Sequence, residues 1–140
     1  ERGLQTQAWD ISRIAVGKLA AHASAHALPL TAVVHDAVAN PPAPGSFDVI
    51  VVYRFLDRGL AARLAPALRP GGLLYYQTFT REGAAGHGPS NPAYRLARNE
   101  LLSFFVPPLR LIAYREDGAI GDPDEGLRGE AWIVAQRDGS

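Results

Sequence analysis

Apolar runs and polar stretches alternate along the chain with the spacing of strands and helices. The clearest run is Phe47–Tyr53, the longest β-branched stretch of the sequence, which follows the turn residues Gly45 and Ser46. A continuous apolar run of this length is typical of a strand buried on both faces of a parallel sheet. Since such strands carry functional residues just past their carboxyl ends, we expect a site to begin near Tyr53 and Arg54.

Further apolar segments predict strands on both sides of this one. These strands are Leu4–Trp9, Leu30–Val34, Leu73–Thr78, Leu109–Arg115 and Glu130–Arg137. The first is closed by Asp10 and the second by His35 and Asp36.

Three segments with helical spacing separate these strands. They are Arg13–Ala27, Leu60–Leu68 and Pro92–Phe105. Ser12 suits the N-cap of the first helix, and Pro66 is expected to kink or shorten the last turn of the second. Strands joined by crossover helices predict an α/β fold, with a mostly parallel sheet between two layers of helices.

The acidic, Gly-rich loop of residues 116–129 joins the last two predicted strands and suggests an antiparallel C-terminal hairpin. The sequence shows no internal repeat and no linker, so we expect a single domain over residues 1–140.

The composition narrows the class of protein. Apolar residues make up 47% of the chain, enough for a packed core, and 14 basic residues balance 14 acidic ones. This balance argues against a nucleic-acid or membrane-surface protein. The absence of cysteine excludes disulfides and thiolate metal sites. Neither a membrane-spanning stretch nor a signal-peptide pattern is present, so a cytoplasmic protein is the expectation.

Two acidic residues stand at the ends of neighbouring predicted strands. Asp10 is placed to accept hydrogen bonds from a ribose diol, and Asp36 to reach the exocyclic amine of an adenine. The plainer interpretations are a helix cap for Asp10 and a solvated turn residue for Asp36. The pair is more informative than either residue alone, because both would face the same crevice.

Other candidates are less specific. The Gly-rich loop from Arg81 to Pro92 has the length of loops that cover active sites, and His87 within it is either a base or a solvated side chain. His22 and His26 share a helix face but lack a third ligand, so no metal site is expected. No nucleophile elbow or phosphate-binding loop is present.

Four motifs together resemble the class I S-adenosylmethionine-dependent methyltransferases. They are Ala8-Trp9-Asp10-Ile11-Ser12, Val34-His35-Asp36-Ala37, Phe47-Asp48-Val49-Ile50-Val51-Val52 and Pro70-Gly71-Gly72-Leu73-Leu74. Within that superfamily the chain looks most like the small TehB-like branch. The supporting runs are Ala8-Trp9-Asp10, Asn99-Glu100-Leu101-Leu102-Ser103-Phe104-Phe105 and Ala113-Tyr114-Arg115-Glu116-Asp117.

The resemblance implies a Rossmann-like sheet that binds S-adenosylmethionine. Asp10 would hold the ribose hydroxyls, and Ile11 would pack on the adenine. Asp36 would bond the adenine amine, and Ala37 would supply a backbone contact.

The same resemblance implies residues around the transferred methyl group. Tyr53 and Arg54 would lie beside the methionine portion of the cofactor. Thr78, Arg81 and His87 would border a small-molecule acceptor. The sequence identifies no strong base and no acceptor.

One family feature has no counterpart in the sequence. The family begins with a strand, a Gly-x-Gly-x-Gly loop and a helix, and nothing of this kind precedes Asp10. In the family order 3-2-1-4-5-7-6, that first strand lies between the Asp10 strand and the Phe47 strand. Three explanations are open: a fragment that begins without methionine, a homodimer or other partner that supplies the missing strand, or direct pairing of the two strands.

The function expected is methyl transfer to a small molecule. The alternatives are a non-catalytic adenosine-binding or protein-interaction module and a fragment of an NAD-dependent oxidoreductase. Pro70-Gly71-Gly72 and the terminal hairpin favour the methyltransferase.

Overall fold

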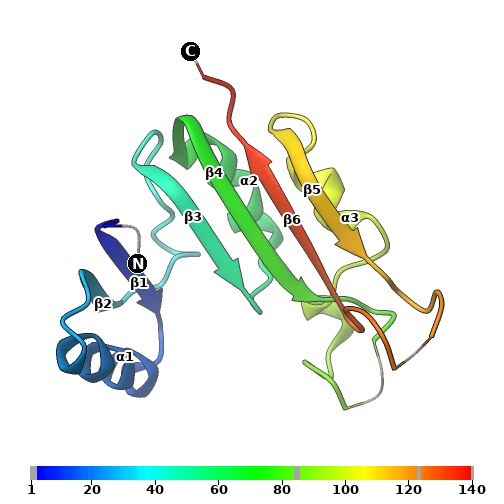
Figure 1. Ribbon diagram of the computed structural model, residues 1–140, viewed down its shortest axis with the longest axis horizontal. Helices are drawn as coiled ribbons and strands as arrows, with labels where there is room; N and C mark the ends of the chain where they lie inside the picture. The colour runs from blue at the N-terminus through cyan, green and yellow to red at the C-terminus, as the bar shows by residue number, and fades with distance from the viewer. Residues whose placement is uncertain (1–2, 84–85, 123, 140) are drawn as a thin grey trace. The chain divides into compact units, whose positions relative to one another are not determined.

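The computed structural model describes residues 3–83, 86–122 and 124–139 (Figure 1). The chain divides into two compact units, residues 1–41 and residues 42–140, and each is described by itself. The expected single domain therefore stays a prediction. In the described part of the chain, every helix falls short of the length and apolar character that crossing a membrane requires.

The first unit is a two-stranded parallel sheet with one helix. It consists of β1 (Thr6–Asp10), α1 (Arg13–Ala25) and β2 (Leu30–Val34). The strands pair in register from Thr6 opposite Leu30 to Asp10 opposite Val34. As predicted, Ser12 caps the helix, since its Oγ accepts a hydrogen bond from the Ala15 N–H at 3.2 Å.

The second unit is a four-stranded mixed sheet with its helices on one face (Figure 1). Its elements are β3 (Phe47–Tyr53), α2 (Arg58–Ala67), β4 (Leu68–Phe79), the 3₁₀ turn η1 (Pro92–Tyr94), α3 (Glu100–Phe105), β5 (Arg110–Glu116) and β6 (Glu130–Gln136). The strand order is β3-β4-β6-β5. The pair β3 and β4 is parallel, whereas β6 runs antiparallel to both β4 and β5, which confirms the predicted C-terminal hairpin.

The expected continuous helix from Pro92 to Phe105 is wrong. The segment holds η1 and the short α3, separated by extended backbone at Leu96 and a left-handed Asn99 with φ 59°. Leu96 N–H donates to the Phe79 carbonyl, and the Leu96 carbonyl accepts from Arg81 N–H, both at 2.9 Å. These bonds to the end of β4 satisfy the hydrogen-bonding groups of the Leu96 backbone, so the chain does not need helical hydrogen bonds there. Tertiary pairing thus overrides the local helix propensity.

Alternation along β4 separates the two faces of the four-stranded sheet. Leu74 and Tyr76 are buried beneath α2 and α3, and the Tyr76 ring lies 5.7 Å from that of Phe105, centroid to centroid. The opposite face carries Val51 and Tyr75, which are 69% and 41% exposed. The core of this unit therefore lies between the sheet and its two helices.

Phe105 is the side chain whose loss should cost most in this core. It is fully buried, so Phe105→Ala is expected to lower the free energy of unfolding by about 3–5 kcal/mol. Phe55, which is 44% exposed, provides the matched control, and Phe55→Ala should cost about 1 kcal/mol. Urea denaturation followed by circular dichroism measures both, and equal losses would contradict this placement of the core.

Candidate functional site

The carboxyl edge of the first unit carries the two predicted acids. Asp10 is the last residue of β1, and Asp36 follows the end of β2 by two positions. Because the strands are parallel and in register, both residues lie at the same edge of this sheet. Trp9 and His35 directly precede the two acids, and their rings lie tilted to each other with centroids 4.1 Å apart.

Both carboxylates already serve local turns. Asp10 Oδ1 accepts a hydrogen bond from Ser12 N–H at 2.7 Å, and Asp36 Oδ1 accepts from the N–H groups of Val38 and Ala39 at 3.0 Å each. Asp10 thus binds the N-cap residue of the helix and Asp36 stabilises a turn, in line with the plainer interpretations. Within the described residues, Oδ2 of each carboxylate has no hydrogen-bond partner, and it is this oxygen that is open to a ligand.

These residues fit the adenosine part of S-adenosylmethionine. A ribose diol and an exocyclic amine both donate hydrogen bonds, which carboxylate oxygens accept. Ile11, directly after Asp10, is 72% exposed, as an apolar side chain that covers a purine ring would be before the ring binds. Ala37, beside Asp36, is half-buried.

The carboxyl edge of the second unit begins at Tyr53 and Arg54. Tyr53 ends β3 and is 59% exposed, whereas Arg54 adopts a left-handed backbone with φ 51°. That conformation costs a non-glycine residue roughly 1–2 kcal/mol and is kept only where the surroundings impose it. The Arg54 guanidinium lies 5.1 Å from the Tyr53 ring centroid and 5.2 Å from that of Phe79, so the turn places the charge between two aromatic rings.

The partner of Arg54 is Glu130, which the sequence analysis did not single out. Glu130 is 3% exposed, and its Oε1 accepts from Arg54 Nε at 2.8 Å while its Oε2 accepts from Gln77 Nε2 at 2.5 Å. It stands opposite Phe79 at the start of β6. One signal in the sequence could have identified Glu130: it is an acid at the first position of the last predicted strand. Since that strand runs antiparallel to β4, its first residue lies at the carboxyl edge of β4.

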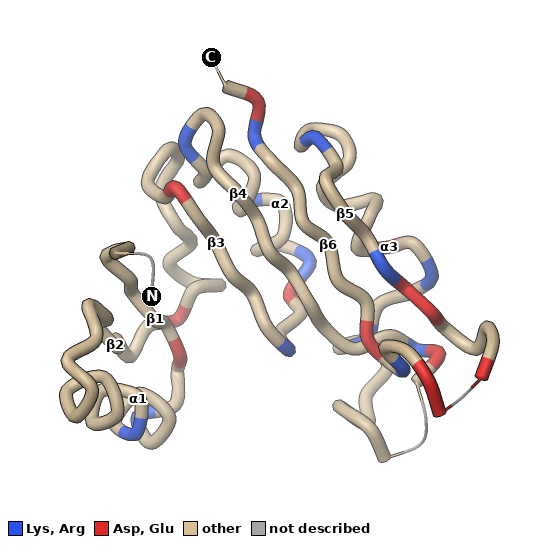
Figure 2. Tube along the Cα trace, viewed as in Figure 1, with Lys and Arg blue, Asp and Glu red and all other residues tan. Residues whose placement is uncertain are grey.

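His87 comes to the same edge on the loop that follows β4. Its Nε2 lies 3.7 Å from Glu130 Oε1, and its ring meets that of Phe79 edge-on at 5.2 Å. Arg95 holds this loop through hydrogen bonds to the carbonyls of His87 at 2.5 Å and Pro89 at 2.6 Å. Acidic and basic residues are interspersed at this end of the four-stranded sheet (Figure 2).

Two predicted acceptor contacts fare differently. Thr78 is 1% exposed and lies on the buried face of the sheet, and its contact with an acceptor stays a prediction. By strand alternation its neighbours Gln77 and Phe79 face the other way. Arg81 is exposed and donates to the Pro92 carbonyl at 3.4 Å.

The structure therefore brings the predicted residues together in two groups. Asp10, Ile11, Asp36 and Ala37 belong to the first unit, whereas Tyr53, Arg54 and His87 belong to the second. Over residues 3–83, 86–122 and 124–139, no cluster of three or more His, Cys, Asp or Glu side chains is arranged to hold a metal ion.

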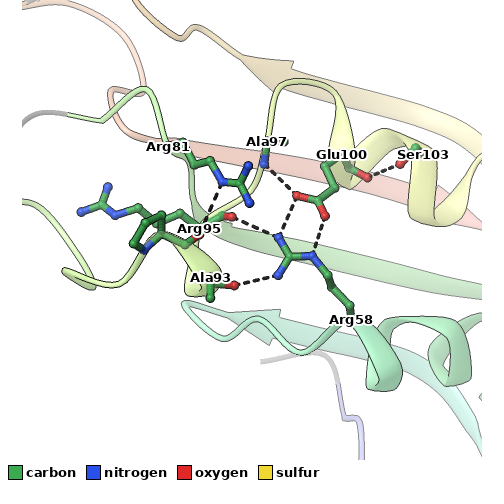
Figure 3. Close-up of polar contacts among 8 residues, drawn as sticks. Arg58, Arg81, Ala93, Arg95, Ala97, Glu100 and Ser103 are labelled. Atoms are coloured by element: carbon green, nitrogen blue, oxygen red, sulfur yellow. Dashed lines mark hydrogen bonds and ion pairs between the residues drawn. The ribbon is translucent and has the colours of Figure 1, made fainter.

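Arg58 joins α2 to the segment that follows the loop (Figure 3). It binds the Glu100 carboxylate through two hydrogen bonds, from Nε to Oε1 at 2.6 Å and from Nη2 to Oε2 at 3.1 Å. It also donates to the carbonyls of Ala93 and Arg95 at 2.7 and 3.3 Å. Glu100 Oε2 in turn accepts from Ala97 N–H at 2.7 Å. Arg58 thereby fixes the segment that carries Arg95.

The pKa of Glu100 lies below its ordinary value. Burial alone would raise the pKa, but the hydrogen bonds from Arg58 and the Ala97 backbone, together with the positive charges of Arg58 and Arg81, outweigh it. The ionised form of Glu100 is therefore favoured in the folded protein.

Comparison with known proteins identifies the fold. A scan against models of protein families and a search of curated protein sequences each gave no match. Solved structures do match. TehB from Haemophilus influenzae has a TM-score of 0.73 and 19% identity, over 97% of this chain and 51% of TehB.

Two further structures match over similar spans. The Burkholderia thailandensis 1,6-didemethyltoxoflavin-N1-methyltransferase, solved with bound S-adenosylhomocysteine, has a TM-score of 0.65 and 18% identity, over 98% of this chain and 63% of that one. The [4+2]-cyclase SpnF has a TM-score of 0.74 and 15% identity, over 98% of this chain and 67% of SpnF. The chain thus spans between half and two thirds of the length of these structures.

The fold is that of the class I S-adenosylmethionine-dependent methyltransferases, as the sequence motifs predicted. The sheet orders agree with the family order 3-2-1-4-5-7-6. The first unit pairs the strands that correspond to family strands 3 and 2, and the second unit has the order 4-5-7-6.

The Arg58–Glu100 pair predicts how stability depends on pH. Because the folded pKa of Glu100 is depressed, its contribution is complete above the ordinary Glu value of 4.5 and is lost as the pH falls through the folded pKa. Glu100→Gln should therefore weaken this acid dependence. Urea denaturation between about pH 7 and pH 3 measures it, with Glu125→Gln, in an exposed loop position, as the control. Identical pH profiles for wild type and Glu100→Gln would rule the contribution out.

Proposed function

We propose that this chain supports S-adenosylmethionine-dependent methyl transfer to a small molecule. The observation that carries the proposal is the pair of acids at the carboxyl ends of β1 and β2, in a fold shared with methyltransferase structures. When bound, the cofactor supplies an electrophilic methyl group on a sulfonium. The chain's own residues bind the adenosine part and line the acceptor side.

The proposed roles follow the two groups of residues. Asp10 holds the ribose hydroxyls with Ile11 against the adenine, and Asp36 bonds the adenine amine beside the Ala37 backbone. These assignments are supported by an open Oδ2 on each acid and by the exposure of Ile11.

Tyr53 and Arg54 are proposed to lie next to the methionine part, and His87 and Arg81 next to the acceptor. The support is their position after β3 and β4, the strand ends where ligands of such sheets bind. The 14 basic and 14 acidic residues of the chain balance one another, which favours a small acceptor over a polyanion. The TehB-like branch, a cytoplasmic location and a partner or second copy beside β3 remain proposals.

A second candidate is a reaction other than methyl transfer on the same fold. SpnF, which matches over 98% of this chain, is described as a [4+2]-cyclase, so this architecture is compatible with a different chemistry. A nicotinamide oxidoreductase is less favoured, because the antiparallel β6 inserted between β4 and β5 is the arrangement of the methyltransferase family.

The binding proposal predicts the effect of removing the ribose contact. Asp10→Ala should weaken S-adenosylhomocysteine binding about tenfold or more, since a hydrogen bond to a charged group is lost. Asp48→Ala is the matched control: Asp48 is also exposed and pairs with Arg69 at 2.6 Å, and its loss should leave affinity unchanged. Calorimetric titration measures all three proteins. Absence of binding by wild type would overturn the proposed function, and unchanged affinity in Asp10→Ala would overturn the ribose assignment.

A further inference from the structure

Glu130 is the most deeply buried acidic residue that the adenosine assignments leave without a role. It is 3% exposed at the carboxyl edge of β4, where a carboxylate is costly unless it is paired. Arg54 and Gln77 each bond one of its oxygens. A merely structural ion pair is complete with these two partners, yet a third polar group approaches the same carboxylate.

That third group is His87. Its Nε2 faces Glu130 Oε1 at 3.7 Å, and the imidazole is 43% exposed, so one side of the ring meets the carboxylate and another meets solvent. A carboxylate next to an imidazole attracts its N–H and so orients the ring. Two cations lie near His87. Arg54 binds the Glu130 carboxylate, and Arg95 donates a hydrogen bond to the His87 carbonyl.

The position of His87 is built into the loop. Gly88 has φ +85°, and a Cβ at this residue would lie 2.5 Å from Phe79 Cδ1, so only glycine lets the loop lie this close to β4. Arg95 adds a third bond, to the Thr80 carbonyl at 3.0 Å, and so ties the His87 loop to the end of β4. His87 is therefore held at the edge rather than solvated on a free loop.

We propose that His87, oriented by Glu130, accepts the proton that the substrate loses when it is methylated. The substrate is then a molecule that is methylated at an N–H or O–H group. This inference rests on the proposed function. The acceptor lone pair forms the new bond to the methyl carbon, and the carbon–sulfur bond breaks with its electrons going to sulfur. The acceptor proton moves to the free imidazole nitrogen, and the imidazolium later releases it to solvent. Glu130 is a positioning residue in this step.

The test is the position of the His87 ring in the full chain. Nuclear Overhauser effects between the ring protons of His87 and Phe79, whose centroids lie 5.2 Å apart, report that position, with the His22–His26 ring pair as an internal reference. Glu130→Gln removes the charged partner of the imidazole and should weaken these effects relative to wild type. Arg69→Gln breaks an exposed ion pair with Asp48 and should leave them unchanged.

A second pair of variants keeps the test decisive if Glu130→Gln fails to fold. Gly88→Ala forces the loop away from Phe79 and should weaken the His87–Phe79 effects in the same way. Gly86→Ala is matched to it, because Gly86 also has φ +85° but meets nothing within 4 Å, and it should leave these effects unchanged.

The outcomes separate the two proposals. Weaker His87–Phe79 effects in Glu130→Gln or Gly88→Ala, with wild type binding S-adenosylhomocysteine, support the pair of Glu130 and His87. Unchanged effects in every folded variant overturn the pair and leave the proposed function standing. If wild type does not bind S-adenosylhomocysteine, the proposed function fails, and the role of His87 in methyl transfer fails with it.

Discussion

The two-residue alternation along β4 is the constraint on which the second unit depends. Leu74 and Tyr76 point to one face and are sealed beneath α2 and α3, so Gln77 and Phe79 must face the other way. A shift of one residue in the pairing with β3 or β6 would exchange these sets and expose the core. The same register places Glu130 opposite Phe79 and within reach of Gln77. The register of β4 therefore determines both the packing of the core and the arrangement of the polar residues at the carboxyl edge.

The polar edge combines two kinds of support. Glu130 and Gln77 lie on paired strands, whose positions the sheet fixes. His87 lies on a loop, whose position Arg95 fixes through backbone carbonyls, and Arg58 secures the segment from which Arg95 extends. Arginine suits this role because its planar group donates in several directions at once and stays charged. A flexible loop can therefore present a defined side chain.

The fold and the reaction are separate conclusions. Methyltransferases and a protein described as a [4+2]-cyclase match this chain with TM-scores between 0.65 and 0.74. A fold is shared among many activities, so chemistry has to be inferred from individual side chains. Here the side chains proposed for it are Asp10 and Asp36 for the adenosine part, and Glu130 with His87 for the acceptor.

The sequence by itself determined the strands, the fold class and the position of two acids at strand ends. These features depend on local patterns, namely apolar runs, N-caps and residues that follow strand ends. It did not determine the break within the helix predicted over Pro92–Phe105, since the bonds of Leu96 to the end of β4 are made by residues distant in sequence. It did not determine the burial of Thr78, which depends on helices packed over the sheet. It treated His87 as a lone loop residue, because Glu130 lies 43 positions away and only the antiparallel entry of β6 brings the two within 3.7 Å.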